Sequence, residues 1–325
     1  MIYALTYHHC RDIGDANFPG LNGVSPASFS EQIALLEVGH SFISPGEIVS
    51  AINPSERSIL VTFDDGLKCS IQNTKGVLAK KNVQAIVYVC SSPLLEQKIL
   101  DVHKFHILQG KLGFQKLEQA LLDAADFYNF NYNYEQQKTD NYKSNHFDSG
   151  PVKAIKQFLN YELDFNVREE VLSNLFERYV GSEKEISKLF YMQENDIKKW
   201  IDLGGKIGAH TYSHYPLSRL SFNEQLREIQ SNKDHLEKIV GGSVNSFAYP
   251  HGVEGTWNSD TLRVLEKLEF GTAMTCCRRI IDPSAPKYNK YEIPRFDVND
   301  VFSKHGDFIL RDSICNLRSI VSKAS

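Results

Sequence analysis

Two carboxylates stand side by side in the segment SILVTFDDG, where Asp64 and Asp65 follow a strand-like apolar run and precede Gly66. Adjacent aspartates repel each other, so the pair needs a compensating positive charge. A divalent cation on one carboxylate would supply that charge and leave the other as a base with a shifted pKa. Asp-Gly is also a common turn dipeptide, and for this fragment alone a turn is the better interpretation.

The segment GAHTYSHYPLS supplies a second group of chemical interest, the pair His210 and His214. Their i, i+4 spacing predicts that both imidazoles lie on one face of a helical turn, a geometry suited to a single metal ion. One carboxylate and two histidines leave coordination positions open for water and substrate. An isolated HxxxH pair is more often a surface or core feature. Its place after a strand, in the same chain as TFDDG, favours the metal site.

Short β-rich runs alternate with helical patterns through most of the chain. The strand-like runs are 2–7, 58–63, 84–89, 206–209, 246–249, 270–274 and 291–294. The helix-like patterns are 28–37, 71–81, 197–203, 223–239 and 259–268. This alternation predicts an α/β fold with a parallel sheet, either open or closed into a barrel, and its count and spacing favour a barrel of seven or eight units. The polar residues singled out above follow strands, which is where a parallel barrel builds its site.

One long stretch, residues 95–195, interrupts this rhythm. It carries helical patterns at 112–125 and 151–179, separated by a segment rich in Asn, Tyr and Phe. Such a stretch is too long for a plain connection, so we expect a helical insertion within one barrel domain that spans residues 1–325. The aromatic residues could stack on sugar rings, although local packing is the better interpretation of them.

The overall composition is that of a globular protein with a sizeable core. The 36 basic and 40 acidic residues give a net charge of −4, which argues against a nucleic-acid partner. The N-terminus lacks the basic start and long apolar stretch of a secretory signal, and no apolar run approaches the roughly 20 residues of a membrane span. The six cysteines show no CxxC spacing and predict reduced thiols. We therefore expect a cytoplasmic protein with no membrane span.

Taken together, TFDDG, HTYSH and FAYPHG resemble, in this order, the polysaccharide deacetylases of the carbohydrate esterase 4 group, or NodB homology family. The family's fold is a distorted (β/α) barrel of about seven strands. The resemblance implies that Asp64 is the general base that activates the attacking water. It also implies that Asp65, His210 and His214 hold a divalent metal, usually zinc, with cobalt, nickel or iron(II) as other ions that serve.

The third motif departs from the family pattern in two ways. Many members carry an arginine there, positioned against the base, whereas the aligned residue here is Ala248. Arg295 in YEIPRFDV could replace that arginine from a neighbouring strand end, with an ordinary surface arginine as the alternative. The residue after Pro250 is His251 where the family usually has an aromatic residue. The resemblance implies that the His251 backbone N–H binds the developing oxyanion.

The residue that serves as general acid in many members of the family is also absent from this chain. Many members have it in a late Leu-x-His motif, which this chain lacks. Members with a permuted motif order carry it on the first strand in a Tyr-His pattern, which YALTYHHC fits. The resemblance therefore makes His8 the candidate acid, with His9 on the opposite strand face. If His8 packs structurally instead, the acid is unidentified.

The expected function is that of a metal-dependent hydrolase that removes an N-acyl group, acetyl by preference, from an amino sugar during surface-polysaccharide biosynthesis. The segment DVHKFH resembles a stretch of members from surface-polysaccharide gene clusters. Its His103 and His106 are more typical of helix surface or core residues than of metal ligands. The resemblance of this segment, combined with a cytoplasmic location, suggests an amino-sugar substrate that is linked to a nucleotide or lipid. The alternatives are a deformylase or cyclic-imide hydrolase and, in a different class, a non-catalytic glycan-binding protein.

Overall fold

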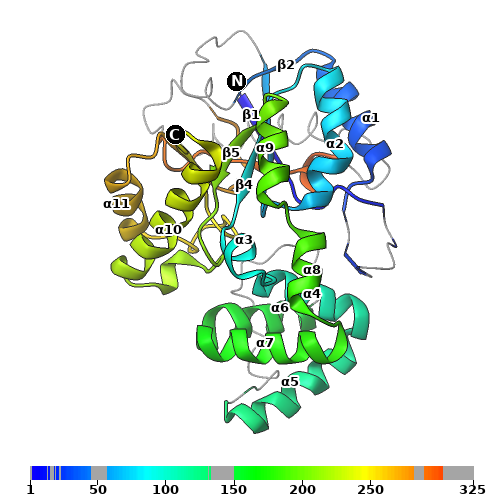
Figure 1. Cartoon of the computed structure of the whole chain (residues 1–325), viewed down its shortest axis with the longest axis vertical. Coiled ribbons are helices and arrows are strands. Elements are labelled where there is room, and N and C mark those ends of the chain that lie inside the picture. Colours follow the sequence, from blue (N-terminus) through cyan, green and yellow to red (C-terminus); the bar gives the residue numbers. More distant parts are fainter. Residues whose placement is uncertain are drawn as a thin grey trace, which may run out of the picture.

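The computed structural model describes residues 2–44 except 13, 15–17, 19 and 22, together with residues 57–130, 132, 150–281 and 289–302. Figure 1 shows a curled sheet wrapped by helices in the upper part of the molecule and a separate group of helices below it.

All strand pairings within the sheet are parallel, and the order along the sheet is β7-β6-β5-β4-β3-β1-β8, with β2 beside β3. The strands are β1 (Ile2–Tyr7), β2 (Ser41–Phe42), β3 (Ser58–Phe63), β4 (Ala85–Val89), β5 (Lys206–Ala209), β6 (Ser246–Ala248), β7 (Thr272–Met274) and β8 (Phe296–Asp297). The expected distorted (β/α) barrel of about seven strands is confirmed.

A short segment near the end of the described chain links the two edges of the sheet. Ile293 forms a parallel bridge with Met274 of β7, and three residues later Phe296 of β8 pairs with Leu5 of β1. The strand expected at 291–294 is therefore displaced to Phe296–Asp297. Pro294 lies between the two pairings.

The strands alternate between two apolar environments, as a two-residue period requires. Inside the barrel, Ile2 and Ala4 of β1 pack with Leu60 of β3 and with Ile86 and Tyr88 of β4. The intervening strand residues pack outward against the surrounding helices in a larger cluster. Strands buried on both faces explain why runs such as SILVTF are almost uniformly apolar.

Helices connect successive strands and cover the outside of the barrel (Figure 1). They are α1 (Pro26–Glu37), α2 (Lys68–Lys80), α9 (Glu194–Asp202), α10 (Phe222–Val240), α11 (Ser259–Lys267) and the short α12 (Val298–Val301). Local sequence sets their ends. In α10, Ser221 and Glu224 form a capping box at the start, and Gly241 adopts a left-handed conformation (φ 69°) just past the end.

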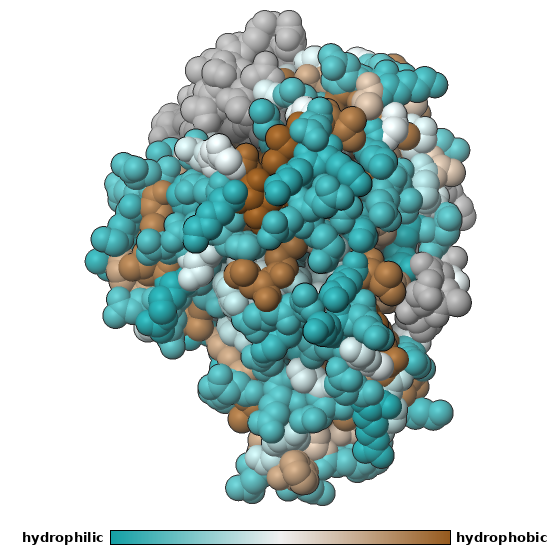
Figure 2. All heavy atoms as spheres, viewed as in Figure 1, coloured by the Kyte–Doolittle hydropathy of each residue, from teal (hydrophilic) through white to brown (hydrophobic). Residues whose placement is uncertain are grey.

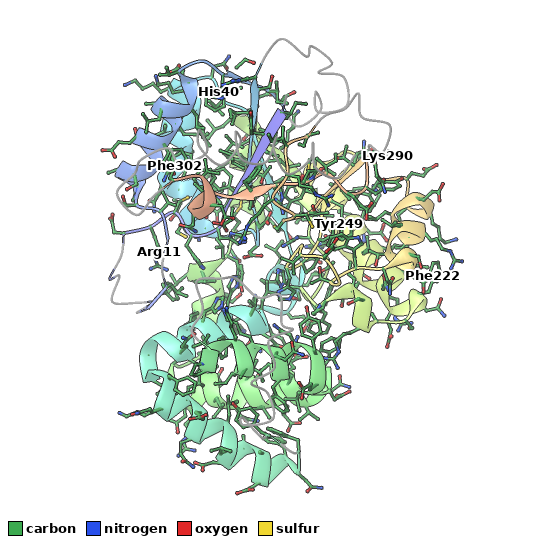
Figure 3. The ribbon with its side chains drawn as sticks, turned by 180° about the vertical axis from the view of Figure 1, so that it is seen from behind. Arg11, His40, Phe222, Tyr249, Lys290 and Phe302 are labelled. Atoms are coloured by element: carbon green, nitrogen blue, oxygen red, sulfur yellow. The ribbon has the colours of Figure 1, made fainter. Side chains whose placement is uncertain are left out.

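Between β4 and β5 the chain forms the lower group of helices, here called the helical insertion. These helices are α3 (Ser92–Glu96), α4 (Asp101–Leu112), α5 (Phe114–Tyr128), α6 (Gly150–Gln157), α7 (Phe165–Tyr179) and α8 (Glu183–Phe190). The insertion has an apolar core of its own, formed mainly by these helices. Arg11, labelled in Figure 3, lies at the junction with the barrel, where its guanidinium stacks 4.6 Å above the Phe18 ring.

The pattern at 151–179 is not one helix. It comprises α6, a π-helical turn (Phe158–Glu162) and α7, and Asp164 caps the start of α7 through its side chain. Phe130 and Tyr132, from the aromatic-rich segment, pack on Phe158. The rest of that segment, residues 131 and 133–149, lies outside the described residues.

None of the described helices is both long and apolar enough to cross a membrane. On the face shown in Figure 2 the described surface is mainly hydrophilic, with apolar residues gathered in small patches.

The close approach of β4 and β5 gives a test of the barrel packing. A Cβ added at Gly208 would lie 2.4 Å from the buried Tyr88 ring. We expect Gly208→Ala to lower the free energy of unfolding by about 1–3 kcal/mol, because the ring must move from a packed position. Urea denaturation measures this change.

Gly76 in α2 provides the matched control, since an added Cβ there meets nothing within 4 Å. We expect Gly76→Ala to raise stability by about 0.5–1 kcal/mol through the better helix propensity of alanine. Unchanged stability in Gly208→Ala would contradict the packing described for Tyr88.

Candidate metal centre and active site

The two adjacent aspartates occupy the turn that follows β3. The Asp64 N–H donates a hydrogen bond to the Tyr7 carbonyl, which continues the pairing of β3 with β1. Asp65 and Gly66 then both take left-handed backbone conformations, with φ of 68° and 66°. This reversal turns the two carboxylates towards different partners. Glycine suits the second position because of its φ and because a Cβ there would lie 3.0 Å from Val89.

Asp65, His210 and His214 converge in a buried group whose ligand atoms all lie within 4.8 Å of one another. Asp65 Oδ1 lies 3.3 Å from His210 Nε2 and 3.4 Å from His214 Nε2. It is buried and accepts no hydrogen bond of acceptable geometry from a described residue. Ligand atoms about 2.0–2.1 Å from a tetrahedral zinc would lie about 3.4 Å apart, so the observed spacing fits such an ion. The predicted ligand residues are thus brought together.

His210 is held in an orientation that suits a metal ligand. Its Nδ1 lies 2.7 Å from the Ala248 carbonyl, to which only a protonated Nδ1 can donate, so in the neutral imidazole that binds a metal Nε2 keeps its lone pair. Its backbone N–H donates to Asn232 Oδ1 of α10 at 3.0 Å. Ala248, the position at which many members of the family in question carry arginine, therefore contributes its carbonyl here.

The helical turn predicted for HTYSH is wrong. Residues 210–214 form a loop, in which Thr211 and His214 both have positive φ (66° and 61°). The His214 N–H donates to Thr211 Oγ1 at 3.0 Å and stabilises this reversal. Two left-handed residues bring the imidazole rings to 4.9 Å between centroids, so a loop achieves the proximity that was expected from a helix.

Asp64 forms a bidentate ion pair with Arg295 inside the barrel. The guanidinium Nη1 donates to Asp64 Oδ1 at 2.7 Å and Nη2 to Oδ2 at 2.8 Å. Arg295 is fully buried, and it also donates to the hydroxyls of Thr6 and Thr62 and to the Thr275 carbonyl. Arg295 is therefore no surface arginine. It lies where the resemblance expected an arginine to meet the base.

Charges around the site shift the pKa values of its groups. Burial alone would raise the pKa of Asp64, but the positive charge and hydrogen bonds of Arg295 outweigh burial and lower it. Burial is likewise outweighed at Asp65, where the hydrogen bond from His103 and the nearby imidazoles of His210 and His214 hold the pKa well below its ordinary value. At His214 burial lowers the pKa, which favours the neutral imidazole that binds metals.

His8, the candidate acid, lies beside the base. Its Nε2 is 3.9 Å from Asp64 Oδ2, and its Nδ1 is 3.7 Å from Asp297 Oδ2. The side chain is 39% exposed, so it can reach a substrate. Strand alternation explains the placement, because His8 continues the inward-facing series of Ala4 and Thr6.

His251 lies on the other side of the metal group, with its ring 4.9 Å from that of His214. Its backbone is left-handed (φ 60°), and its N–H donates to no other described residue, so the donor is available to a ligand. Burial, reinforced by the positive charge of Arg168, lowers the pKa of His251 to about 3. The ring is therefore neutral.

Two site residues were missed from the sequence. Asp297 had a usable signal, because it stands two residues after Arg295 on one strand face and so points the same way. His103 had none. It comes from α4 of the helical insertion and places Nε2 at 3.2 Å from Asp65 Oδ2, a contact that arises only from the tertiary fold.

Three comparisons bear on the chain. A model of the family described as polysaccharide deacetylase matches residues 136–273. This match includes His210, His214 and His251, whereas Asp64 and Arg295 lie outside it. No curated protein matches the sequence.

Several solved structures share the fold. The Streptococcus pyogenes deacetylase PplD in complex with acetate has a TM-score of 0.56 at 16% identity, with 91% of each chain covered. IcaB from Ammonifex degensii has a TM-score of 0.52 at 16% identity, again with 91% of each chain covered. A de-N-acetylase from Aggregatibacter actinomycetemcomitans has a TM-score of 0.52 at 12% identity, with 94% of this chain and 98% of that chain covered.

Because the ion pair of Asp64 and Arg295 is buried, we expect its loss to lower the stability of the protein strongly. Arg295→Met leaves the Asp64 carboxylate buried without its partner, which we expect to lower the free energy of unfolding by about 3–5 kcal/mol. Guanidinium chloride denaturation measures the change. The control is Arg263→Met, which breaks a surface pair of 2.9 Å with Asp260 and should cost less than about 1 kcal/mol. Equal losses in the two variants would contradict the buried pairing.

Proposed function

We propose that this chain belongs to the polysaccharide deacetylase family and that it removes an N-acyl group, acetyl by preference, from an amino sugar with the help of a divalent metal. The observation that carries this proposal is the juxtaposition of the buried group Asp65, His210 and His214 with the ion pair of Asp64 and Arg295. A binding protein would gain nothing from a buried carboxylate held ionised beside such a group.

The protein groups divide the work of amide hydrolysis. A divalent ion held by Asp65, His210 and His214 would acidify a water molecule and polarise the acyl oxygen. Asp64 takes a proton from the attacking water. Arg295 keeps Asp64 ionised and fixes the plane of its carboxylate, so that the acceptor oxygens have a defined direction.

The remaining groups act on the oxyanion and the leaving amine. The free N–H of His251 donates a hydrogen bond to the acyl oxygen as negative charge develops there, an interaction typically worth about 3 kcal/mol in the transition state. His8, steadied by Asp297, gives a proton to the sugar nitrogen as the C–N bond breaks. Water supplies the hydroxyl of the released carboxylate, and the sugar leaves as an amine.

The comparisons and the sequence support a proposal for the substrate class. A structural relative bound to acetate and another named as a de-N-acetylase support the acetyl group. We propose further that the amino sugar is still attached to a nucleotide or lipid carrier in the cytoplasm, as an intermediate of surface-polysaccharide biosynthesis. Zinc is the metal we propose for the buried group.

The test is acetate and formate release from a panel of N-acylated nucleotide sugars, lipid-linked sugars, short oligosaccharides and cyclic imides, with zinc-loaded protein. We expect acetate release from an amino sugar. Asp64→Asn should lower kcat about 10²–10⁴-fold and still bind zinc, because it removes only the base. His210→Ala should lose zinc and turnover together.

Each result has a definite meaning. Formate release would replace the acetyl group by formyl, and opening of the imides would replace deacylation by that reaction. Full turnover in purified Asp64→Asn would contradict its role as base. Protein that binds no zinc, cobalt, nickel or iron(II) would contradict the metal-dependent mechanism.

The paired arrangement of His8 and Asp297 makes a separate prediction. His8→Gln should lower kcat about 10²–10⁴-fold, because the leaving amine loses its proton donor, while zinc affinity stays at the wild-type value. Asp297→Asn should lower kcat less, since it only orients the imidazole. His235→Gln on α10 is the control. A kcat unchanged by His8→Gln would show that another group protonates the amine.

A further inference from the structure

The two oxygens of the Asp65 carboxylate have different surroundings. Oδ1 faces His210 and His214, as described above, whereas Oδ2 lies 3.2 Å from Nε2 of His103. His103 is 2% exposed, so this contact is shielded from water. The side chain belongs to α4 of the helical insertion, and the carboxylate belongs to the barrel.

Hydrogen bonds hold both ring nitrogens of His103. The Leu100 N–H donates to the Tyr191 hydroxyl at 3.0 Å. Burial raises the pKa of Tyr191 well above its ordinary value, so the phenol keeps its one proton. The Tyr191 hydroxyl forms a hydrogen bond with His103 Nδ1 at 2.6 Å. An ionised carboxylate can only accept, so His103 Nε2 carries a proton and donates it in a hydrogen bond to Asp65 Oδ2.

The ring cannot turn away easily, because aromatic rings enclose it. The His103 ring centroid lies 5.1 Å from that of Phe190 and 5.7 Å from that of His9, both in edge-on contacts. Tyr191 is held as well, since it forms an antiparallel bridge with Leu67.

The same end of the insertion also contacts the Asp65 turn through the backbone. The Met192 N–H donates to the Gly66 carbonyl at 2.9 Å, one residue after Asp65. The turn is thus held from the insertion by a side chain and by the main chain.

We propose that His103 is a positioning residue for the metal centre, which orients Asp65 by donating to Oδ2 and so presents Oδ1 to the ion. This inference rests on the proposed function. A proton on Nε2 excludes that nitrogen as a ligand itself, so His103 acts through Asp65. Groups that donate to or accept from metal ligands in this way typically contribute 10–100-fold to metal affinity.

The experiment compares zinc affinities, measured by competition with a chromophoric chelator, and needs no substrate. His103→Leu should weaken zinc binding about 10–100-fold relative to wild type. His103→Gln carries an amide N–H that can reach the Nε2 position, and we expect it to restore most of the affinity. His106→Leu, three residues along α4 and with no hydrogen bond to Asp65 among the described residues, is the matched control and should bind zinc as wild type does.

Tyr191→Phe provides a second variant that leaves His103 in place. It removes the hydroxyl that holds the His103 ring through Nδ1, so its zinc affinity should lie between those of wild type and His103→Leu. If His103→Leu does not fold, the zinc affinities of Tyr191→Phe and His103→Gln test the positioning role of His103. The melting temperature of each metal-free variant separates a packing effect from an effect on the metal.

The outcomes are distinguishable. Wild-type zinc affinity in His103→Leu, or in Tyr191→Phe where His103→Leu does not fold, would overturn the positioning role and leave the proposed function intact. A lower melting temperature of the metal-free protein with unchanged zinc affinity would also overturn it, because that pattern is one of packing alone. Wild-type protein that binds no zinc would overturn the metal centre and this inference with it.

Discussion

The buried pair of Asp64 and Arg295 is the interaction around which the barrel interior is arranged. A guanidinium removed from water loses several kcal/mol of hydration, and only good geometry with satisfied donors offsets that loss. Hydroxyls from β1 and β3 and a carbonyl just after β7 supply those acceptors. The segment that carries Arg295 also links β7 to β1, so the charge lies at the join between the sheet edges. Apolar residues of similar volume would often give equal or greater stability at such a position, so the presence of the pair agrees with the catalytic role proposed for Asp64.

Much of this arrangement could be predicted from the sequence, because a strand has a two-residue period and a parallel barrel gathers its strand ends. Those two regularities place Asp64, His210 and Arg295 at one rim without any tertiary information. They fail where the backbone leaves regular structure. The i, i+4 spacing of HTYSH fits a helix, yet left-handed residues produce the same proximity in a loop. The contact of His103 with Asp65 could not be predicted, because it depends on how a separate helical layer docks on the barrel.

The site also concentrates backbone strain. Asp65, Thr211, His214 and His251 all have positive φ without being glycine, a conformation that costs of order 1–3 kcal/mol per residue. Each lies beside a contact that holds it, such as the Thr211 hydroxyl for His214 or the Met192 N–H for the turn at Asp65. The rim is thus less stable locally than the strands beneath it, and those strands, buried on both faces, provide the stability that tolerates it.

The helical insertion has its own apolar core, and this affects how the protein fluctuates. A region with a separate core can open as a cooperative unit while the remainder stays folded. Opening of α4 and α8 would release both His103 and the Met192 amide from the Asp65 turn, and the carboxylate would lose its fixed direction. By thermodynamic reciprocity, an ion that binds the ordered carboxylate more tightly must hold the insertion closed. Binding of a metal ion at the barrel rim would then slow amide hydrogen exchange in the helices of the insertion, although these helices contribute no ligand to the ion.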